Sequence, residues 1–359
     1  MLFVILNFMS LLFFVGIAAF LFSFLATPIV KKLAEKLGVV DRPSERRINK
    51  VPIARLGGLA VASSFILLAI LFGQIDKHLI GFLLGALVLL VFGIWDDIKN
   101  LKPWVQLLGQ ILAALILVAS GIGIEVLSNP FGPAIHLDSW KIPLDFLGTT
   151  YHITVWSDLL TLVWVVGMVN VMNFLDGLDG LASGVSGIGS LVLVVLALSP
   201  VVGQTQVALL AALLAGASFG FLPHNFHPAK IFLGSAGSYF LGFALATLAI
   251  ISGGKLATAF LVLGFPIIDG LWVAGRRLLK KKSPFQGDLS HLHHRLLAVG
   301  LTQRRAVIFI YVLCAGFGIT ALLASSQLKM MAMAVLLVTV IFLSVLLYFF
   351  KKNYAAKAT

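Results

Sequence analysis

Charged residues are scarce in this chain. Lys, Arg, Asp and Glu make up 11% of its 359 residues, whereas hydrophobic residues make up 60%. Soluble globular domains carry about 25% charged residues, so this composition excludes a water-soluble globule. We therefore expect lipid to be the solvent of the chain, and we expect residues 1–359 to form a single transmembrane domain.

Cysteine is almost absent too, because Cys314 is the only one. A single cysteine excludes an internal disulfide and a cysteine-rich metal site, and its apolar surroundings indicate a packing role. The first basic residue is Lys31, so the first apolar run lacks the charged start of a cleavable signal peptide. We expect this run to be retained as the first helix.

Apolar runs of about 20 residues, the length that crosses a bilayer as a helix, recur along the whole chain. They predict an all-α polytopic integral membrane protein with about eleven transmembrane helices. The expected spans are approximately 8–28, 57–74, 79–95, 104–123, 157–175, 183–199, 205–222, 232–252, 256–275, 305–325 and 330–350.

The basic residues predict the orientation, with the N-terminus outside and the C-terminus cytoplasmic. All but four of the 26 Lys and Arg then lie on the cytoplasmic side, as the positive-inside rule requires. Outside, alternating residues predict a small hairpin near 124–156. The exceptions are Lys77, Lys141, Lys255 and Lys329, and the cytoplasmic loops are about 29–56, 96–103, 176–182, 223–231 and 276–304.

Two adjacent carboxylates, Asp96 and Asp97, end the third expected helix. Neighbours on a helix point about 100° apart, so we expect the two to have different roles. One could bind a metal while the other contacts a substrate or accepts a proton. The alternative is an interfacial stop signal paired with Lys99 or Lys102.

Polar residues also end the fifth expected helix, where Asn170, Asn173 and Asp176 are spaced three apart. They form a stripe that needs a cavity or a partner at membrane depth. Gly177 and Gly180 loosen the backbone beside Asp179, which would allow close approach of phosphates. The alternative is a polar seam between helices.

Converging carboxylates would repel one another, and a hard divalent cation would resolve the conflict. Magnesium prefers oxygen ligands and is usually shared with substrate phosphates, whereas zinc would want more His or Cys. We therefore expect Mg²⁺ at these carboxylates, with Mn²⁺ as the alternative ion.

Cations and histidines crowd the loop from Arg276 to Leu296. If 289–297 is helical, His291, His294 and Arg295 share a face that could grip a diphosphate. Binding of a transition metal by the three histidines and a purely exposed cluster are alternatives. The first basic loop, which ends with Arg55, could close over an anionic ligand or lie on anionic lipid heads.

Four segments carry a resemblance to a known family. They are Asp96-Asp97, the run Asn173 to Gly180, the run Asn225 to Ser238, and His291 to Leu296. Together they resemble the bacterial polyprenyl-phosphate N-acetylhexosamine-1-phosphate transferases, in the WecA/TagO-like branch that moves N-acetylglucosamine-1-phosphate. The match covers nearly the whole chain.

The resemblance implies attack by undecaprenyl phosphate on a UDP-N-acetylhexosamine at the cytoplasmic face of a bacterial inner membrane, with release of UMP and initiation of a cell-envelope glycan. The lipid bilayer and a second copy of the chain are further candidate partners, and no nucleic acid is expected. The implied catalytic residues are Asp96, Asp97, Asp176 and Asp179; the implied metal positions are Asp97, Asp176 and Ser235; the implied substrate contacts are Asn170, Asn173, Asn225, Arg277, His291, His293, His294, Arg295 and Arg55.

The chain departs from the family pattern at three positions. Ser235 stands where relatives have an aspartate that binds magnesium, Gln106 where they usually have lysine, and Asn49 where a histidine is common. A neutral hydroxyl is a poor substitute for a carboxylate ligand, so we hypothesise that Ser235 weakens metal binding. An altered member of the family with low activity is one consequence.

Two other classes of protein also place acids in membranes. A transporter or flippase would keep its ionisable groups near mid-membrane, often in repeated halves, whereas here they lie mostly at helix ends and no halves repeat. An enzyme that joins a nucleotide-linked alcohol to lipid would have further aspartates four apart, but the next carboxylate after Asp179 is Asp269. The transferase is therefore the favoured prediction.

Overall fold

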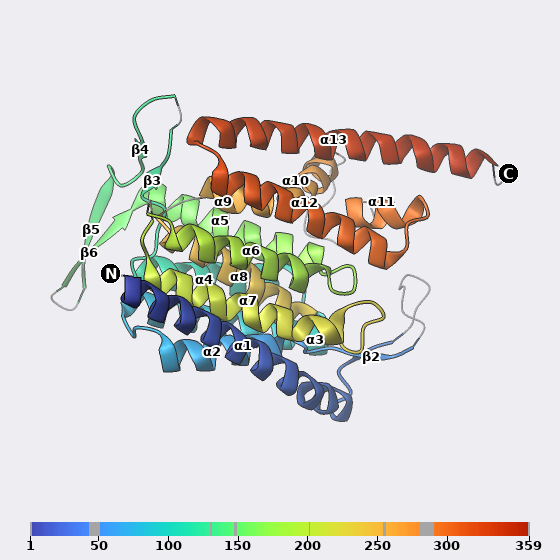
Figure 1. Cartoon of the computed structure of the whole chain (residues 1–359), viewed down its shortest axis with the longest axis horizontal. Coiled ribbons are helices and arrows are strands. Elements are labelled where there is room, and N and C mark those ends of the chain that lie inside the picture. The colour runs from blue at the N-terminus through green and yellow to red at the C-terminus, as the bar shows by residue number, and fades with distance from the viewer. Residues whose placement is uncertain are drawn as a thin grey trace.

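The computed structural model describes residues 2–42, 51–129, 131–146, 149–200, 202–253, 256–279 and 291–357. Its long helices run side by side as one bundle (Figure 1). The predicted all-α polytopic class is confirmed. Asn49, which was singled out in the sequence, lies outside the described residues, with the rest of 43–50 and 280–290.

Within the described residues, eight helices are long and apolar enough to cross a membrane, and two apolar helices are shorter. The count of about eleven crossings and the orientation stay predictions. The eight are α1 (Leu2–Lys36), α3 (Lys77–Lys99), α5 (Val155–Leu175), α6 (Leu181–Leu198), α7 (Thr205–Asn225), α8 (Gly234–Ile251), α12 (Gln303–Leu323) and α13 (Ser326–Lys357), and the shorter two are α2 (Gly58–Phe72) and α4 (Pro103–Ala119).

The expected span 256–275 is not one continuous helix, so that prediction was wrong. It is divided into α9 (Leu256–Val262) and α10 (Gly264–Leu279). Pro266 lies in the first turn of α10, where a residue without a backbone N–H is tolerated, whereas inside a continuous helix it would remove a hydrogen bond. A short helix, α11 (Leu292–Ala298), follows beyond the segment left undescribed.

Local capping signals set the ends of α3 and the start of α4. The side chain of Asp76 accepts a hydrogen bond from the N–H of Leu79 at 2.8 Å and begins α3. Asn100 has φ 48°, the left-handed conformation that commonly ends a helix. Pro103 then begins α4 in its first position. The turn between them places Asp96 and Asp97 at a helix end.

The core of the bundle is formed by α7 and α8. In the most apolar windows of these helices, 78% and 89% of residues are buried, whereas the outer α1 window is 22% buried. A Cβ on Gly216 would lie 2.1 Å from the carbonyl oxygen of Gly16 and one on Gly220 2.2 Å from that of Phe20. The two glycines therefore let α7 pack closely on α1, as small residues four apart commonly do in membrane helices.

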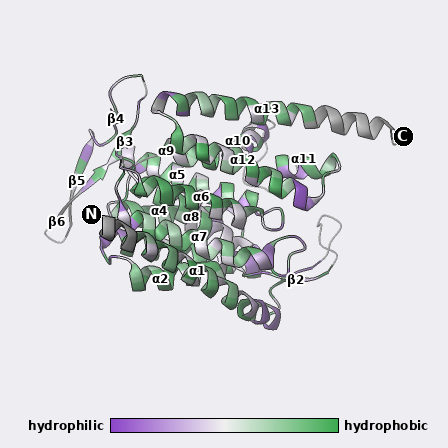
Figure 2. Ribbon diagram, in the orientation of Figure 1, coloured by the Kyte–Doolittle hydropathy of each residue, from purple (hydrophilic) through white to green (hydrophobic). Residues whose placement is uncertain are grey.

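Short strand pairs occupy both ends of the bundle (Figure 1). One end, called the hairpin end below, carries two antiparallel pairs and confirms the predicted hairpin. The opposite end, called the site end, carries α11 and a pair that the sequence did not predict. Hydrophobic residues cover the bundle between the two ends (Figure 2). The pairs are β3 (Val126–Leu127) with β4 (Ile135–His136), β5 (Lys141–Phe146) with β6 (Thr149–Thr154), and β1 (Val40–Asp41) with β2 (Ile53–Ala54).

Candidate active site

Asp97 lies against the N-terminus of α8. Its Oδ1 accepts the N–H of Ser235 at 2.9 Å, and its Oδ2 accepts the N–H of Ala236 at 3.2 Å. The first N–H groups of a helix have no partner within the helix and carry partial positive charge, so they hold an anion well. The C-terminal end of α3 is thereby fixed to the beginning of α8.

Gly234 makes this contact possible. Its φ is 76°, a left-handed conformation, and a Cβ at this position would lie 2.5 Å from Oδ2 of Asp97. A side chain would therefore be strained and would also push the carboxylate away from the helix. Glycine is required here both by the backbone conformation and by the close approach of Asp97.

Asp96 has entirely different partners from its neighbour. Its Oδ1 accepts the N–H of Leu101 at 2.7 Å and the amide of Gln106 at 2.9 Å, and its Oδ2 accepts the hydroxyl of Ser235 at 2.6 Å. All three donors are neutral. Two of the three positions that depart from the family pattern, Gln106 and Ser235, thus meet on one carboxylate.

Asp176 joins the acidic pair from α5, which ends directly before it. Loss of contact with water raises the pKa of the Asp176 carboxyl well above its usual value, and repulsion from Asp97 raises it further. The charge of Arg55 and the backbone N–H of Gly234 act in the opposite direction. The structure therefore brings together Asp97 and Asp176, as the sequence predicted, in a setting that favours a cation.

Arg55 is held beside these carboxylates by the chain around it. The backbone of Ala54 pairs with the 231–232 segment, and the Arg55 N–H donates to the carbonyl of Val39. Its Nε lies 3.6 Å from Oδ1 of Asp41 and 3.9 Å from Oδ1 of Asp97. This Nε is buried and makes no hydrogen bond, whereas the Arg55 side chain as a whole is 25% exposed, so any contact with an anion would involve the terminal nitrogens of the guanidinium.

Asp179 is the next carboxylate along the same turn. Its Oδ2 lies 2.7 Å from Nδ1 of His227 and accepts the N–H of Ala229 at 3.1 Å. The carbonyl of His227 in turn accepts Nε of Arg304 at 2.8 Å. Sequence reasoning missed His227, although it lies inside the run Asn225 to Ser238 that carried the resemblance.

Both the oxygen and the nitrogen of the Asn225 side-chain amide make hydrogen bonds around this turn. Its oxygen accepts the N–H of Gly180 and the hydroxyl of Ser183 at 3.1 and 3.0 Å, and its nitrogen donates to the carbonyl of Ile231 at 3.1 Å. Asn225 is also buried. Its observed role is therefore to join two turns of the site.

The three polar residues of the predicted stripe on α5 each interact with a different part of the structure. Asn170 donates to Gln110 of α4 at 2.6 Å, and Asn173 accepts the hydroxyl of Ser238 of α8 at 3.1 Å. Both asparagines therefore form polar seams between helices, the alternative that the sequence left open. Asp176, at the end of the stripe, faces the other carboxylates.

His291 does not share a helical face with His294 and Arg295, so that prediction was wrong. Helix α11 begins one residue later, and His291 is buried, with Nδ1 2.8 Å from Oδ2 of Asp269. Arg295 donates to the carbonyl of Ser344 at 3.4 Å. The physical reason is that the carboxylate of Asp269 binds the ring of His291 and the N–H of Leu292, and so fixes where α11 begins.

His293 and His294 do approach the acidic turn. A Cβ on Gly177 would lie 2.6 Å from Nε2 of His293 and 3.4 Å from Nε2 of His294, so both imidazoles converge on this glycine. Burial lowers the pKa of His293 well below its usual value, and the neighbouring imidazoles lower it further. The neutral His293 has a buried Nε2 without a hydrogen-bond partner. Arg277 lies in the last turn of α10, at the same end.

The donor set fits magnesium better than a transition metal. Among the described residues, no group of three or more His, Cys, Asp or Glu side chains is arranged to hold a metal. Of the positions expected to hold the ion, Asp97 and Asp176 offer carboxylate oxygens that interact electrostatically, whereas the hydroxyl of Ser235 donates to Asp96. Mg²⁺ is commonly held by one or two carboxylates and completes its shell with water and phosphate oxygens, so two carboxylates suffice.

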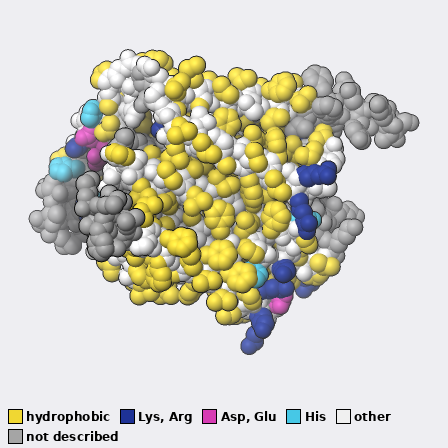
Figure 3. All heavy atoms as spheres, in the orientation of Figure 1, with side chains coloured by type: hydrophobic (Ala, Val, Ile, Leu, Met, Phe, Trp, Pro, Cys, Tyr) yellow, Lys and Arg dark blue, Asp and Glu magenta, His cyan; other side chains and the backbone are white. Residues whose placement is uncertain are grey.

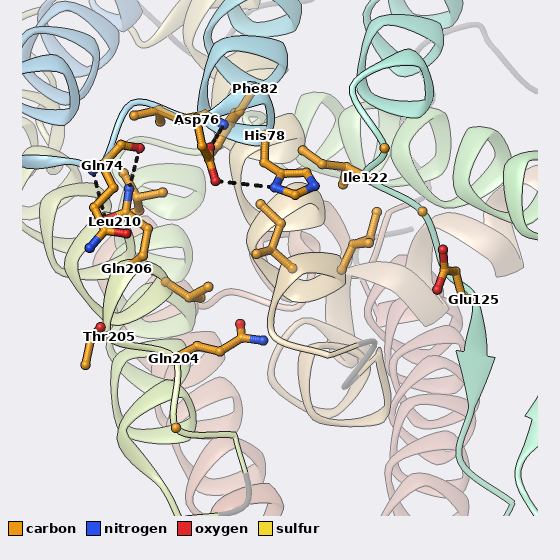
Figure 4. Close-up of a pocket in the computed structure, with 17 residues that line it drawn as sticks. Gln74, Asp76, His78, Phe82, Ile122, Glu125, Gln204, Thr205, Gln206 and Leu210 are labelled. Carbon is orange, nitrogen blue, oxygen red and sulfur yellow. Dashed lines mark hydrogen bonds and ion pairs between the residues drawn. The ribbon is translucent and has the colours of Figure 1, made fainter. Parts of the chain in front are cut away.

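A separate cavity of about 500 Å³ opens at the hairpin end. Figure 4 shows Gln74, Asp76, His78, Gln204 and Gln206 around it. The side chain of Gln206 is engaged with the backbone of Gln74, and Asp76 caps α3. No predicted site residue lines this cavity, so the candidate chemistry belongs to the site end.

Comparison with known proteins agrees with this geometry. Residues 79–253, which contain Asp97, Asp176 and Ser235, match the glycosyl transferase family 4. A probable undecaprenyl-phosphate N-acetylglucosaminyl 1-phosphate transferase of Bacillus subtilis is 34% identical over 341 residues, covering 92% of this chain and 90% of that protein.

Two further relatives are similar over most of the chain. The decaprenyl-phosphate N-acetylglucosaminephosphotransferase of Mycobacterium tuberculosis is 34% identical, covering 83% of this chain and 78% of the relative. The undecaprenyl-phosphate alpha-N-acetylglucosaminyl 1-phosphate transferase of Salmonella typhi is 29% identical, covering 85% and 82%. The predicted resemblance is confirmed, and this multi-pass membrane chain belongs to the glycosyl transferase family 4.

Proposed function

We propose that this chain transfers an N-acetylhexosamine-1-phosphate, most simply N-acetylglucosamine-1-phosphate, from its UDP sugar to undecaprenyl phosphate. The observation that carries the proposal is the pair Asp97 and Asp176 beside Arg55, at the end of a membrane bundle that belongs to this family. The names of the relatives support the sugar and the polyprenyl phosphate.

In the proposed reaction, an oxygen of the lipid phosphate attacks the phosphorus that is linked to the sugar. One P–O bond forms there, and the bond to the bridging oxygen breaks, so that UMP leaves with that oxygen and its electron pair. Phosphoryl transfer requires alignment and charge stabilisation more than covalent chemistry from the protein. A site built from carboxylates and cations suits this requirement.

Each group of side chains has a distinct part in this proposal. Asp97 and Asp176 would hold Mg²⁺, which supplies charge neutralisation to the phosphates when it is bound. Arg55, whose side chain is 25% exposed, would contact a phosphate oxygen through the terminal nitrogens of its guanidinium. His294, which is partly exposed, would donate to a phosphate oxygen near Gly177, next to the buried His293. Asp179, fixed by His227, would contact the nucleotide.

The lipid substrate needs an apolar path that reaches the site end. A groove of about 520 Å³ lies between α9–α10 and α13, with apolar walls from Phe260, Trp272 and Met333. It extends to Ser344, whose carbonyl accepts Arg295. An apolar groove beside a cation supports binding of a prenyl chain with a phosphate head.

The site end is proposed to face the cytoplasm of a bacterial inner membrane. The Lys and Arg side chains visible in Figure 3 gather mainly at this end of the bundle, whereas acidic and His side chains are visible at both ends. The last turns of α1, α3 and α10 each contain basic residues. Such an asymmetry is typical of the cytoplasmic side of a membrane protein.

The proposal is tested with purified protein in lipid nanodiscs, supplied with Mg²⁺, undecaprenyl phosphate and a panel of UDP sugars. The expected products are UMP and a lipid-linked sugar phosphate, both identified by mass spectrometry and both lost on chelation of the metal. Asp176→Asn is the inactive control. If no UDP sugar releases UMP, even with the Ser235→Asp variant, the proposal is wrong. Uptake of a sugar nucleotide by sealed vesicles that contain the protein would favour a transporter.

A further inference from the structure

Asp269 is a buried carboxylate that sequence reasoning did not place in the site. It lies in α10, and the whole residue is 6% exposed. Its Oδ2 is 2.8 Å from Nδ1 of His291, and its Oδ1 accepts the N–H of Leu292 at 2.9 Å. One carboxylate of α10 thus fixes the two residues at the start of α11.

This contact determines where the next histidines lie. The rings of His291 and His293 are stacked, with centroids 5.5 Å apart, and those of His293 and His294 are 4.3 Å apart. Nε2 of His293 is only 2.6 Å from the point where a Cβ of Gly177 would stand. The line of contacts therefore runs from Asp269 through His291 to the turn that carries the site carboxylates.

The remainder of α11 has other attachments. Leu292 and Leu296 are buried, and Arg295 donates to the carbonyl of Ser344 on α13. Loss of the Asp269 carboxylate would therefore release the beginning of α11 without detaching its end. The effect of such a loss should be a displacement of His291 and His293 rather than unfolding.

We propose that Asp269 is a positioning residue for the reaction, which holds His293 over Gly177 by anchoring His291. His293 contacts the ring of His294, which would meet a substrate phosphate, and it borders the turn that carries Asp176 and Asp179. Such groups must be held to within a fraction of an ångström, because a displacement of about 1 Å can lower a rate about 100-fold. The kinetic test of this inference rests on the proposed transferase function, whereas the chemical-modification test does not.

The kinetic test is a double-mutant cycle between Asp269 and Gly177. In the otherwise unchanged chain, Gly177→Ala should lower kcat about tenfold or more, because the new methyl group meets a fixed His293. In Asp269→Ala, where His293 can move, the same change should lower kcat by less than about twofold. Equal losses in the two backgrounds would overturn the proposal.

The matched control is Asp158→Ala. Asp158 also accepts a backbone N–H, that of Thr154 at 2.9 Å, but it lies at the start of α5 toward the hairpin end. The Asp158→Ala variant should leave the loss of kcat caused by Gly177→Ala unchanged. The conservative variant Asp269→Asn keeps an acceptor for Leu292 and should recover most of the kcat lost in Asp269→Ala; recovery no better than that of Asp269→Ala would contradict an anchoring role.

A second measurement does not depend on activity. Diethyl pyrocarbonate modifies accessible imidazoles, and mass spectrometry locates the modified histidine. His293 is 1% exposed, so it should be protected in the original chain and in Asp269→Asn, and modified at least about fivefold faster in Asp269→Ala. Cys314, also buried, should stay unreactive to maleimide in all three and so report an intact bundle.

The two arms separate the two proposals. If the original chain releases no UMP but His293 becomes reactive only in Asp269→Ala, the anchoring role stands and the proposed function fails. If UMP is released but His293 remains protected in Asp269→Ala while Cys314 is also unreactive, Asp269 does not position His293 and the inference is overturned.

Discussion

The hydroxyl of Ser235 donates a hydrogen bond to Oδ2 of Asp96, with 2.6 Å between the two oxygen atoms. The amide of Gln106 donates to the other oxygen of the same carboxylate at 2.9 Å. Sequence reasoning treated Ser235 and Gln106 as two separate departures from the family pattern. The structure shows that they are neighbours on one carboxylate, so their effects should be coupled.

We expect Ser235→Asp to make both stability and turnover depend strongly on magnesium. The new carboxylate would face Asp96 where a donor now lies, and repulsion should lower the thermal midpoint in chelator. With Mg²⁺, a third carboxylate near Asp97 should lower the ion concentration for half-maximal turnover about tenfold. Titrations of turnover and of the midpoint against Mg²⁺ measure both effects.

Ser235→Asn is the control for this change, because the Asn side chain has nearly the same shape as that of Asp. It adds volume and keeps a donor for Asp96 but introduces no charge, so its magnesium dependence should match that of the original chain. If Asp and Asn at this position give the same curves, charge at position 235 has no part in metal binding.

Gln106→Lys should rescue the stability of Ser235→Asp in the absence of metal. An ammonium group at position 106 would lie near Asp96, where Gln106 now donates, and would offset the added carboxylate. Gln106→Lys alone should have a much smaller effect on the thermal midpoint. Additive changes in the midpoint across the four variants would show that the two positions are independent.

Gly234→Ala should abolish activity and lower stability. The left-handed backbone alone costs about 1–2 kcal/mol with a side chain, and the methyl group would also displace Asp97, which a Cβ would approach to 2.5 Å. Gly253→Ala is the matched control, because Gly253 has φ 80° and nothing lies within 4 Å of its Cβ position. Similar losses in the two variants, read as unfolding midpoints and UMP release, would refute the contact with Asp97.

Arg55→Ala should lower turnover at least about tenfold, because the charge that faces Asp41 and Asp97 is lost and a phosphate loses a donor. Arg55→Lys should recover only part of the loss, since an ammonium lacks the fork of the guanidinium. Arg305→Ala, an exposed cation at the same end, serves as the control. The assay is UMP release at varied UDP-sugar concentration, and an unchanged rate in Arg55→Ala would exclude Arg55 from the site.

Much of the membrane architecture follows from the sequence. The length of an apolar run and the residues that cap it are local properties, so most of the expected helices and the 124–156 hairpin match the structure to within a few residues, whereas α1 and α13 are longer than their expected spans. The break at 263 was missed, although Pro266 was its signal. The acidic motifs also predicted which carboxylates gather at the site end.

The sequence alone could not assign the partners of these side chains. Ser235 and Asp96 are 139 positions apart, and Asp269 and His291 are 22 positions apart. No periodicity relates such residues, because their contact depends on how α3, α8, α10 and α11 pack. A buried Asp inside an apolar run was the one available signal for Asp269.

Composition and apolar periodicity therefore determined that this chain is a helical membrane protein, and its motifs determined the family and the acidic residues of the site. Tertiary packing decided the rest: that Asn170 and Asn173 bond to neighbouring helices, that Asn225 joins two turns, and that His291 belongs to Asp269. The physical reason is that a polar group in a low-dielectric interior takes whichever partner the packing brings near, and that partner can come from any part of the chain.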